Sequence, residues 1–257
     1  MPNIKDILDY LFTLAPAKYK MDWDNIGLMC GHSDREVRRV LVALDATPDV
    51  ADEAKALGCE LVVTHHPLIF TPVYTVSDAT LTGNCLLKYL DNDIAVISMH
   101  TNLDCAPGGV NDVLAERLGL EKITVFEDEE ASHLVRCGEV PVQPLADFLP
   151  LVRRQLNCEG LRYADGCRPV HRVAVGGGAC SGFTEQLQKA GYDTFVTADI
   201  KYNGFIDAEQ MGINIIDAGH FATENPVVWM LRDRLAAQFP DVTALVSETH
   251  RDATRFL

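Results

Sequence analysis

The first half of the chain alternates between short apolar runs and longer segments with helical spacing of apolar residues. Apolar runs rich in β-branched residues predict buried strands at 40–45, 61–64 and 94–100. Between the first two, residues 47–58 have the pattern of a helix with a threonine cap, proline in the first turn and glycine at the end. A strand, helix and strand of this length predict a parallel crossover. Helical spacing also predicts helices at 4–12, 84–90 and 110–118.

The second half has a similar layout, although it shows no convincing sequence repeat. Apolar runs predict strands at 134–137, 171–175, 194–200 and 213–217, and an edge strand at 244–247. Helical spacing predicts helices at 143–156, 183–190, 205–211 and 224–239. We therefore expect an α/β protein of two similar three-layer halves with mainly parallel sheets. The candidate ligands described below predict a metal site between the halves.

An acidic run at residues 127–130 is typical of a solvated connector and predicts the boundary between the halves. The first α/β half would span residues 1–126 and the second residues 127–257. The C-terminal helix and strand, at about 223–257, are expected to pack back on the first half.

Composition excludes several classes of function. The formal net charge of -15 argues against binding a nucleic acid duplex or an anionic membrane through a basic face. No apolar run reaches the ~18–20 residues of a membrane span, and the N-terminus lacks a signal-peptide pattern, so we expect a cytoplasmic protein. The eight cysteines are scattered without a C-x-x-C pair, which predicts reduced side chains rather than a zinc or disulfide framework.

The most informative stretch is residues 61–67, where an apolar run ends in His65 and His66 and is followed by Pro67. Neighbouring side chains in a strand point to opposite faces. The two imidazoles can therefore converge on one ion only if the strand ends near Thr64, which Pro67 favours because it has no N–H for a ladder hydrogen bond. The alternative is a strand end that happens to carry two polar residues.

Other predicted strands also end in residues that can bind metals. Asp45 ends one of them, and His100 leads into a predicted loop that contains Asp104. Because sites in open parallel sheets form at the carboxyl ends of strands, these positions support a shared site.

His220 and Glu224 lie four residues apart at the start of a predicted helix, so they share one face. Imidazole and carboxylate at this spacing can bind one ion. Alternatively, Glu224 interacts favourably with the helix dipole while His220 caps the helix.

Taken together, His65, His66, Asp104, His220 and Glu224 predict a metal site. Three histidines and two carboxylates suit Zn, Fe, Mn or Co better than Ca or Mg. Five protein ligands exceed the three of a catalytic zinc site, whereas two divalent ions ~3.5–4 Å apart use such a set naturally. Glu224 or Asp104 is the candidate for a bridging ligand. His100 is a candidate proton relay or a supporting partner of Asp104.

A glycine-rich turn at Gly176, Gly177 and Gly178 joins a predicted strand to a helix. Such a turn either is a tight connection or binds an anion through its backbone N–H groups. It matches neither the dinucleotide fingerprint nor the P-loop.

Six segments of the chain resemble, in order, the motifs of the GTP cyclohydrolase 1 type 2 homologue family, also called Nif-three-like. The resemblance covers essentially the whole chain, and the histidine pair together with the H-x-x-x-E pattern is its most specific part. The segments are WDNIGL at 23–28, THHPL at 64–68, HTNLD at 100–104, GGG at 176–178, TADIKY at 197–202 and DAGHFATE at 217–224.

This resemblance implies two divalent metal ions per subunit, with ligands at His65, His66, Asp104, His220 and Glu224. It also implies two α/β halves and a toroidal homohexamer with the metal sites facing an internal cavity. The chain is too short for the domain that some members insert between the halves.

One position departs from the family pattern, because Asn203 stands where many members have a histidine after Lys-Tyr. If that histidine takes part in the chemistry, this protein differs in activity.

Two functions follow from the sequence. The first is a metal-dependent hydrolase acting on a nucleotide or related small molecule, by imidazole-ring opening of GTP or by phosphoester hydrolysis. The second is a non-catalytic metal-binding scaffold with a metal-delivery or regulatory role, because no strong nucleophile or base is evident beyond the ligands.

Overall fold

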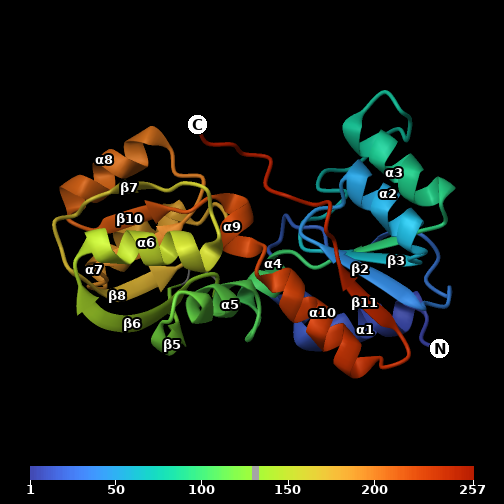
Figure 1. Cartoon of the computed structure of the whole chain (residues 1–257), viewed down its shortest axis with the longest axis horizontal. Helices are drawn as coiled ribbons and strands as arrows, with labels where there is room; N and C mark the ends of the chain where they lie inside the picture. The colour runs from blue at the N-terminus through green and yellow to red at the C-terminus, as the bar shows by residue number, and fades with distance from the viewer. Residues whose placement is uncertain (129–132) are drawn as a thin grey trace. The chain divides into compact units, whose positions relative to one another are not determined.

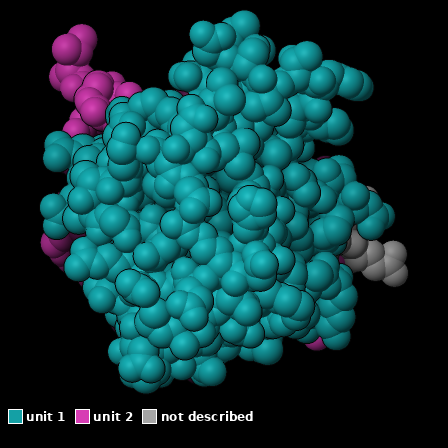
Figure 2. Space-filling view, turned by 90° about the vertical axis from the view of Figure 1, so that its right-hand side faces the viewer, with its two compact units in different colours: residues 1–106, 227–251 teal, residues 107–226, 252–257 magenta. Residues whose placement is uncertain are grey.

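The computed structural model describes residues 1–128 and 133–257 and has an α/β architecture with two sheets. The chain divides into two compact units (Figure 2). Unit 1 comprises residues 1–106 and 227–251, and unit 2 comprises residues 107–226 and 252–257.

Unit 1 is built around a sheet with the strand order β1-β4-β3-β2-β11. Its strands are parallel except β1, which pairs antiparallel with β4. The strands are β1 (Gly27–Cys30), β2 (Arg39–Ala43), β3 (Leu61–Thr64), β4 (Ala95–Ser98) and β11 (Thr243–Val246). The helices are α1 (Ile4–Leu14), α2 (Pro48–Leu57), α3 (Leu81–Asp91), α4 (Thr101–Cys105) and α10 (Val227–Gln238), with a 3-10 turn, η1, at Ala17–Tyr19.

Helices cover both faces of this sheet. Figure 1 shows α2 and α3 on one side and α1 and α10 on the other. The first side is sealed by side chains such as Val50 and Tyr89, which pack on Leu41 and Val62 of the sheet. Because β2, β3 and β4 are buried along their whole length, apart from Arg39 at the start of β2, these strands are nearly continuous apolar runs.

Unit 2 has a mixed sheet with the strand order β5-β6-β8-β9-β10-β7. Strands β8, β9 and β10 are parallel, while β5, β6 and β7 join through antiparallel pairs. The strands are β5 (Glu121–Val125), β6 (Arg136–Gln143), β7 (Arg162–Ala164), β8 (Val170–Val175), β9 (Thr194–Thr197) and β10 (Asn214–Asp217). The helices are α5 (Val110–Arg117), α6 (Leu145–Leu156), α7 (Thr184–Lys189), α8 (Tyr202–Met211) and α9 (His220–Glu224), with a 3-10 turn, η2, at Ser181–Phe183.

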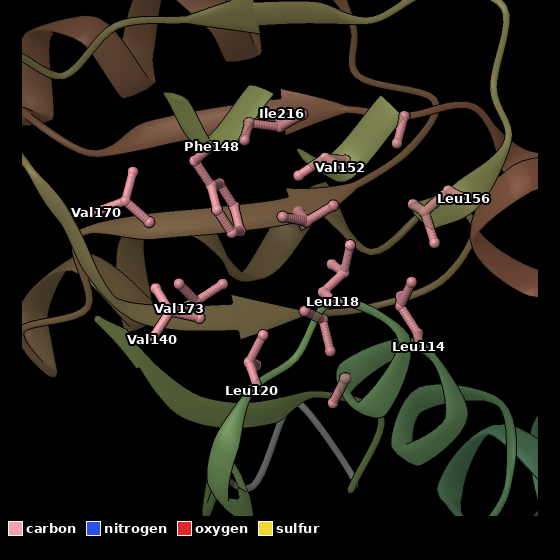
Figure 3. Packing of buried hydrophobic residues seen from close by; sticks show 14 of the residues in the cluster. Leu114, Leu118, Leu120, Val140, Phe148, Val152, Leu156, Val170, Val173 and Ile216 are labelled. Carbon is pink, nitrogen blue, oxygen red and sulfur yellow. The ribbon is translucent and has the colours of Figure 1, made fainter. Parts of the chain in front are cut away.

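The alternation of side chains along β8, β9 and β10 creates two cores in unit 2. Val173 and Ile216 face α5 and α6, where Phe148 fills the centre of the cluster (Figure 3). Their neighbours Ala174 and Ile215 face α7 and α8. Three layers result, since both faces of the parallel strands are apolar.

The predicted α/β class is confirmed, with two differences in detail. The sheet of unit 2 is mixed rather than mainly parallel. Strands β1, β5 and β7 were not predicted, because none of them is a fully buried apolar run. Only the first residue of β1 is buried, β5 begins with Glu121 and Lys122, and β7 is Arg162-Tyr163-Ala164.

Two predicted segments near the candidate site also differ. Residues 101–104, expected as a loop, belong to the short helix α4. The single helix expected at 224–239 is instead two helices, α9 and α10, separated by Asn225 and Pro226. A helix of five residues is too short to reveal itself by apolar periodicity.

The division into units differs from the expected boundary after residue 126. Residues 107–126 group with unit 2, because α5 and β5 pack on the sheet through side chains such as Leu114 and Leu120. Residues 227–251 group with unit 1, where β11 pairs with β2. Part of the acidic run, Glu129 and Glu130, lies outside the described residues.

All eight cysteines lie in the described part of the chain, and none forms a disulfide. Among the described residues, no helix combines the length and apolar character needed to cross a membrane.

Candidate metal centre

Strand β3 ends at Thr64, as the convergence of the two histidines requires. After it the backbone turns, and the N–H groups of His65 and His66 both donate to the carbonyl of Leu44, at 3.2 and 2.9 Å. The two imidazole rings therefore lie close together, with centroids 4.9 Å apart. The full burial of His65 contrasts with the partial exposure of His66.

A third imidazole, that of His100, joins this pair from the end of β4. Its ring centroid lies 5.3 Å from that of His65 and 5.7 Å from that of His66. Each of the three rings offers a nitrogen atom within 4.8 Å of the others. We call these residues, His65, His66 and His100, the histidine cluster.

A hydrogen bond donated by Nδ1 fixes the tautomer of His65. The Nδ1 atom lies 2.8 Å from the backbone oxygen of Met99. A carbonyl oxygen can only accept, so Nδ1 carries the proton and Nε2 presents its lone pair when the ring is neutral. Metal-binding histidines in proteins commonly have this arrangement.

Asp45 provides the corresponding acceptor for His66, whose Nδ1 lies 2.7 Å from Asp45 Oδ1. The other carboxylate oxygen of Asp45 lies 2.9 Å from Nε2 of His250. Burial alone would raise the pKa of Asp45, but the hydrogen bonds from His250 and His66 outweigh it and hold this pKa well below its ordinary value. Asp45 is therefore ionised and accepts both bonds.

Asp24 provides the acceptor for His100, whose Nδ1 lies 2.7 Å from Asp24 Oδ1. The second oxygen of Asp24 accepts bonds from the N–H and hydroxyl of Thr101. Although burial raises the pKa of Asp24, the hydrogen bonds from His100 and Thr101 lower it below the ordinary value. All three members of the histidine cluster thus share one pattern, with Nδ1 bonded to a fixed oxygen.

Asp104 brings a carboxylate to the cluster from helix α4. It is buried, and its Oδ1 lies 3.6 Å from Nε2 of His65. Two ligands bound about 2.0–2.2 Å from one zinc ion in a tetrahedral arrangement lie roughly 3.4 Å apart. The observed separation therefore fits two ligands of one ion.

Unit 2 repeats the pattern on helix α9. The Nδ1 atom of His220 lies 2.7 Å from Oδ2 of Asp199, and its Nε2 lies 3.0 Å from Oε2 of Glu224. The side chain of Glu224 is buried. When His220 is neutral with Nδ1 protonated, two electron-rich atoms face one another across this 3.0 Å gap, which suits a cation bound to both.

The glycine-rich turn follows β8 in unit 2. Its backbone N–H groups donate within the protein, from Gly176 to the carbonyl of Val196, from Gly177 to the side chain of Asn111 and from Gly178 to the hydroxyl of Thr223. These bonds use the donors that an anion would need, so they favour the tight connection over anion binding.

Gly178 has a further role in the packing around α9. Its φ of +62° is a left-handed conformation that favours glycine. A Cβ atom at this position would lie 2.3 Å from Oε1 of Glu224 and 3.0 Å from Nε2 of His220. The absence of a side chain therefore lets the turn lie directly against both residues.

The structure brings the predicted residues together within each unit. His65, His66, His100 and Asp104 converge in unit 1, and His220, Glu224 and the glycine turn converge in unit 2. The residues that accept the Nδ1 bonds were not predicted in that role. Asp45 and Asp199 follow strands, and Asp24 and Asp199 lie in the WDNIGL and TADIKY motifs, so these three carried a signal. His250 carried none. Asn203, where the expected histidine is missing, is exposed in α8.

Comparisons with known proteins identify the family of this chain. The family model of Duf34/NIF3 (NGG1p interacting factor 3) matches residues 2–253. The chain belongs to the Duf34/NIF3 family. A protein named GTP cyclohydrolase 1 type 2 homolog from Clostridium perfringens is 33% identical over 99% of this chain and 100% of its own length. A Streptomyces coelicolor protein of the same name is 35% identical over 88% of this chain and 83% of its own.

Solved structures share the fold of this chain along essentially its whole length. A Bacillus cereus protein described as related to NIF3 aligns with a TM-score of 0.91 at 25% identity, covering 100% of this chain and 99% of its own. A Staphylococcus aureus protein described as hypothetical aligns with a TM-score of 0.90 at 28% identity, covering 99% of both chains.

The first prediction concerns Asp24 in this Duf34/NIF3 chain. Its folded-state pKa is lowered, so its ionised form stabilises the fold. We expect Asp24→Asn to reduce the free energy of unfolding by about 1–3 kcal/mol at neutral pH. The difference from wild type should be constant above the unfolded-state pKa of about 3.9 and should disappear as pH falls through the lower folded-state pKa.

Urea unfolding of metal-stripped protein across this pH range measures the difference. The matched control is Asp22→Asn, because Asp22 is exposed in the same segment. A destabilisation by Asp24→Asn that stays the same in acid would contradict the assigned role of the carboxylate.

The second prediction concerns Gly178. A methyl group there would collide with Glu224, and alanine disfavours the left-handed backbone conformation of this position. We therefore expect Gly178→Ala to lower the free energy of unfolding by about 1–3 kcal/mol. Thermal unfolding measures this loss. Gly182→Ala is the control, since a Cβ atom at Gly182 meets no atom within 4 Å. Equal effects of the two substitutions would show that the close approach at Gly178 is unimportant.

Proposed function

We propose that this protein binds two divalent metal ions and acts as a metal-dependent hydrolase on a nucleotide or related small molecule. One observation carries the proposal: four histidines each have Nδ1 bonded to a fixed oxygen atom. His171 also has Nδ1 bonded to a carbonyl oxygen, so the bond alone does not mark a ligand. In these four histidines it presents Nε2 in the form that binds metals, and each of the four lies in a group of side chains that could hold an ion. The names of the curated relatives support the class of reaction.

The proposal assigns five side chains as protein ligands. His65, His66 and Asp104 come from unit 1, and His220 and Glu224 come from unit 2. Nitrogen and oxygen donors without cysteine suit Zn, Fe, Mn or Co. Divalent ions bound by these residues would supply Lewis acidity and would acidify water.

His100 has a different role in the proposal. Asp24 holds its Nδ1 proton, so Nε2 can accept a second proton while the ionised Asp24 stabilises the resulting imidazolium. His100 would thus take up the proton released when water attacks the substrate. Its partial exposure gives that proton a route to solvent.

Two further expectations belong to the proposal. The resemblance of the sequence to its family implies a toroidal homohexamer, and it also implies a nucleotide substrate. Sedimentation analysis of the purified protein tests the first of these.

We expect His65→Ala and Glu224→Ala each to lower the affinity for divalent metal without unfolding the chain. Loss of a supporting residue typically costs roughly 10–100-fold in metal affinity, so loss of a ligand should cost at least as much. Titration with Zn or Co, with circular dichroism as the test of folding, measures this effect.

The controls for these variants are His32→Ala and Glu209→Ala, which remove an exposed histidine and an exposed glutamate. Both should bind metal as the wild type does. Unchanged metal binding in folded His65→Ala or Glu224→Ala would show that the ligand assignment is wrong.

A substrate panel tests the hydrolase directly. Protein loaded with Zn, Mn, Co or Fe should turn over GTP or a phosphoester, a chelator should abolish the activity and added metal should restore it. Tight metal binding without turnover of any of these compounds would favour the non-catalytic scaffold.

A further inference from the structure

Two large aromatic side chains lie beside the histidine cluster and remain exposed to solvent. Trp23 is 62% exposed and Phe70 is 54% exposed. Their ring centroids are 5.8 Å apart, with an angle of 61° between the rings. Both also contact His100, at centroid distances of 6.0 Å for Trp23 and 6.1 Å for Phe70. We call Trp23 and Phe70 the aromatic pair.

Hydrogen bonds hold the backbone on either side of the aromatic pair. Asp24, next to Trp23, is buried and bonded to His100 and Thr101. The side chain of Asn25 donates to the carbonyl of Ile69, the residue before Phe70, at 2.7 Å. The two segments are therefore tied to each other and to the histidine cluster, so the backbone that carries the two rings is held in place before any ligand arrives.

The chemistry of this surface restricts what it can bind. The rings are uncharged, so they can attract a ligand by stacking and need no basic group, in a chain whose formal net charge is -15. Planar heteroaromatic rings such as nucleobases stack on protein aromatic side chains. This stacking tolerates any base, because every base has a π-face.

We propose that the aromatic pair binds the planar heteroaromatic ring of the substrate and sets it against His100. Stacking on Trp23 and Phe70 would orient the ring so that its reacting group reaches the histidine cluster. The link between the bound ring and metal-dependent hydrolysis rests on the proposed function, whereas binding of the ring itself does not.

The experiment uses the tryptophan itself as the reporter. The chain has two tryptophans, so Trp229→Phe leaves Trp23 as the single tryptophan, whose emission is recorded with excitation selective for indole. Guanosine and cytidine are the probes, one purine and one pyrimidine, and ribose 5-phosphate is the probe without a base. We expect saturable quenching by at least one nucleoside and none by ribose 5-phosphate. The nucleoside that quenches at the lower concentration identifies the ring class.

Variants then test the two side chains in the otherwise natural chain. Trp23→Ala and Phe70→Ala should weaken nucleoside binding, measured by equilibrium dialysis, by roughly 5- to 100-fold. Trp23→Phe keeps a ring and should lose less. Trp229→Ala, which removes an indole that is 41% exposed in α10, should bind the nucleoside as the wild type does.

Metal content, measured on the same samples, separates this proposal from the proposed function. Variants of the aromatic pair should retain their metal, and metal-free protein should still show quenching. Metal-loaded protein that shows no saturable quenching with either nucleoside would overturn the ring-binding site alone. A change in sedimenting mass on Trp23→Ala or Phe70→Ala would also overturn it, since the pair would then be a contact between copies of the chain.

Discussion

The hydrogen bond at Nδ1 of each imidazole is the interaction on which the candidate site depends. A histidine can present either ring nitrogen, and only a fixed acceptor on one of them decides which. His65 uses a backbone carbonyl, whereas His66, His100 and His220 use Asp45, Asp24 and Asp199. Ionised carboxylates can serve this purpose here because hydrogen bonds keep the pKa of Asp45 and that of Asp24 low despite burial.

The fold places these acceptors at the ends of parallel strands. The buried strands β2, β3 and β4 end side by side, so Asp45, His65 and His100 follow them at one edge of the sheet. The same rule places Asp199 after β9 and His220 after β10 in unit 2. Burial of both faces of each sheet thus determines where the strands end, and the strand ends determine where the imidazoles and carboxylates lie.

Much of this could be predicted from local patterns. Apolar runs located the central strands, and the position of Pro67 after two histidines located the end of β3. Helix α4 was missed because its five residues depend on tertiary bonds, such as that from Thr101 to Asp24, that no local pattern reveals. The partnership of Asp45 with His250 was equally hidden, because about two hundred residues separate them in the chain. Apolar spacing also predicted one helix at 224–239, and it did not reveal the break at Asn225 and Pro226 between α9 and α10.

The most direct test is a crystal structure of the zinc-loaded protein with anomalous diffraction recorded at the zinc edge. The account predicts zinc peaks within bonding distance, about 2.0–2.1 Å, of Nε2 of His65, His66 and His220, with Nδ1 of each still bonded to its oxygen acceptor. Peaks at Nδ1, or a protein saturated with zinc elsewhere and without peaks at these residues, would contradict it.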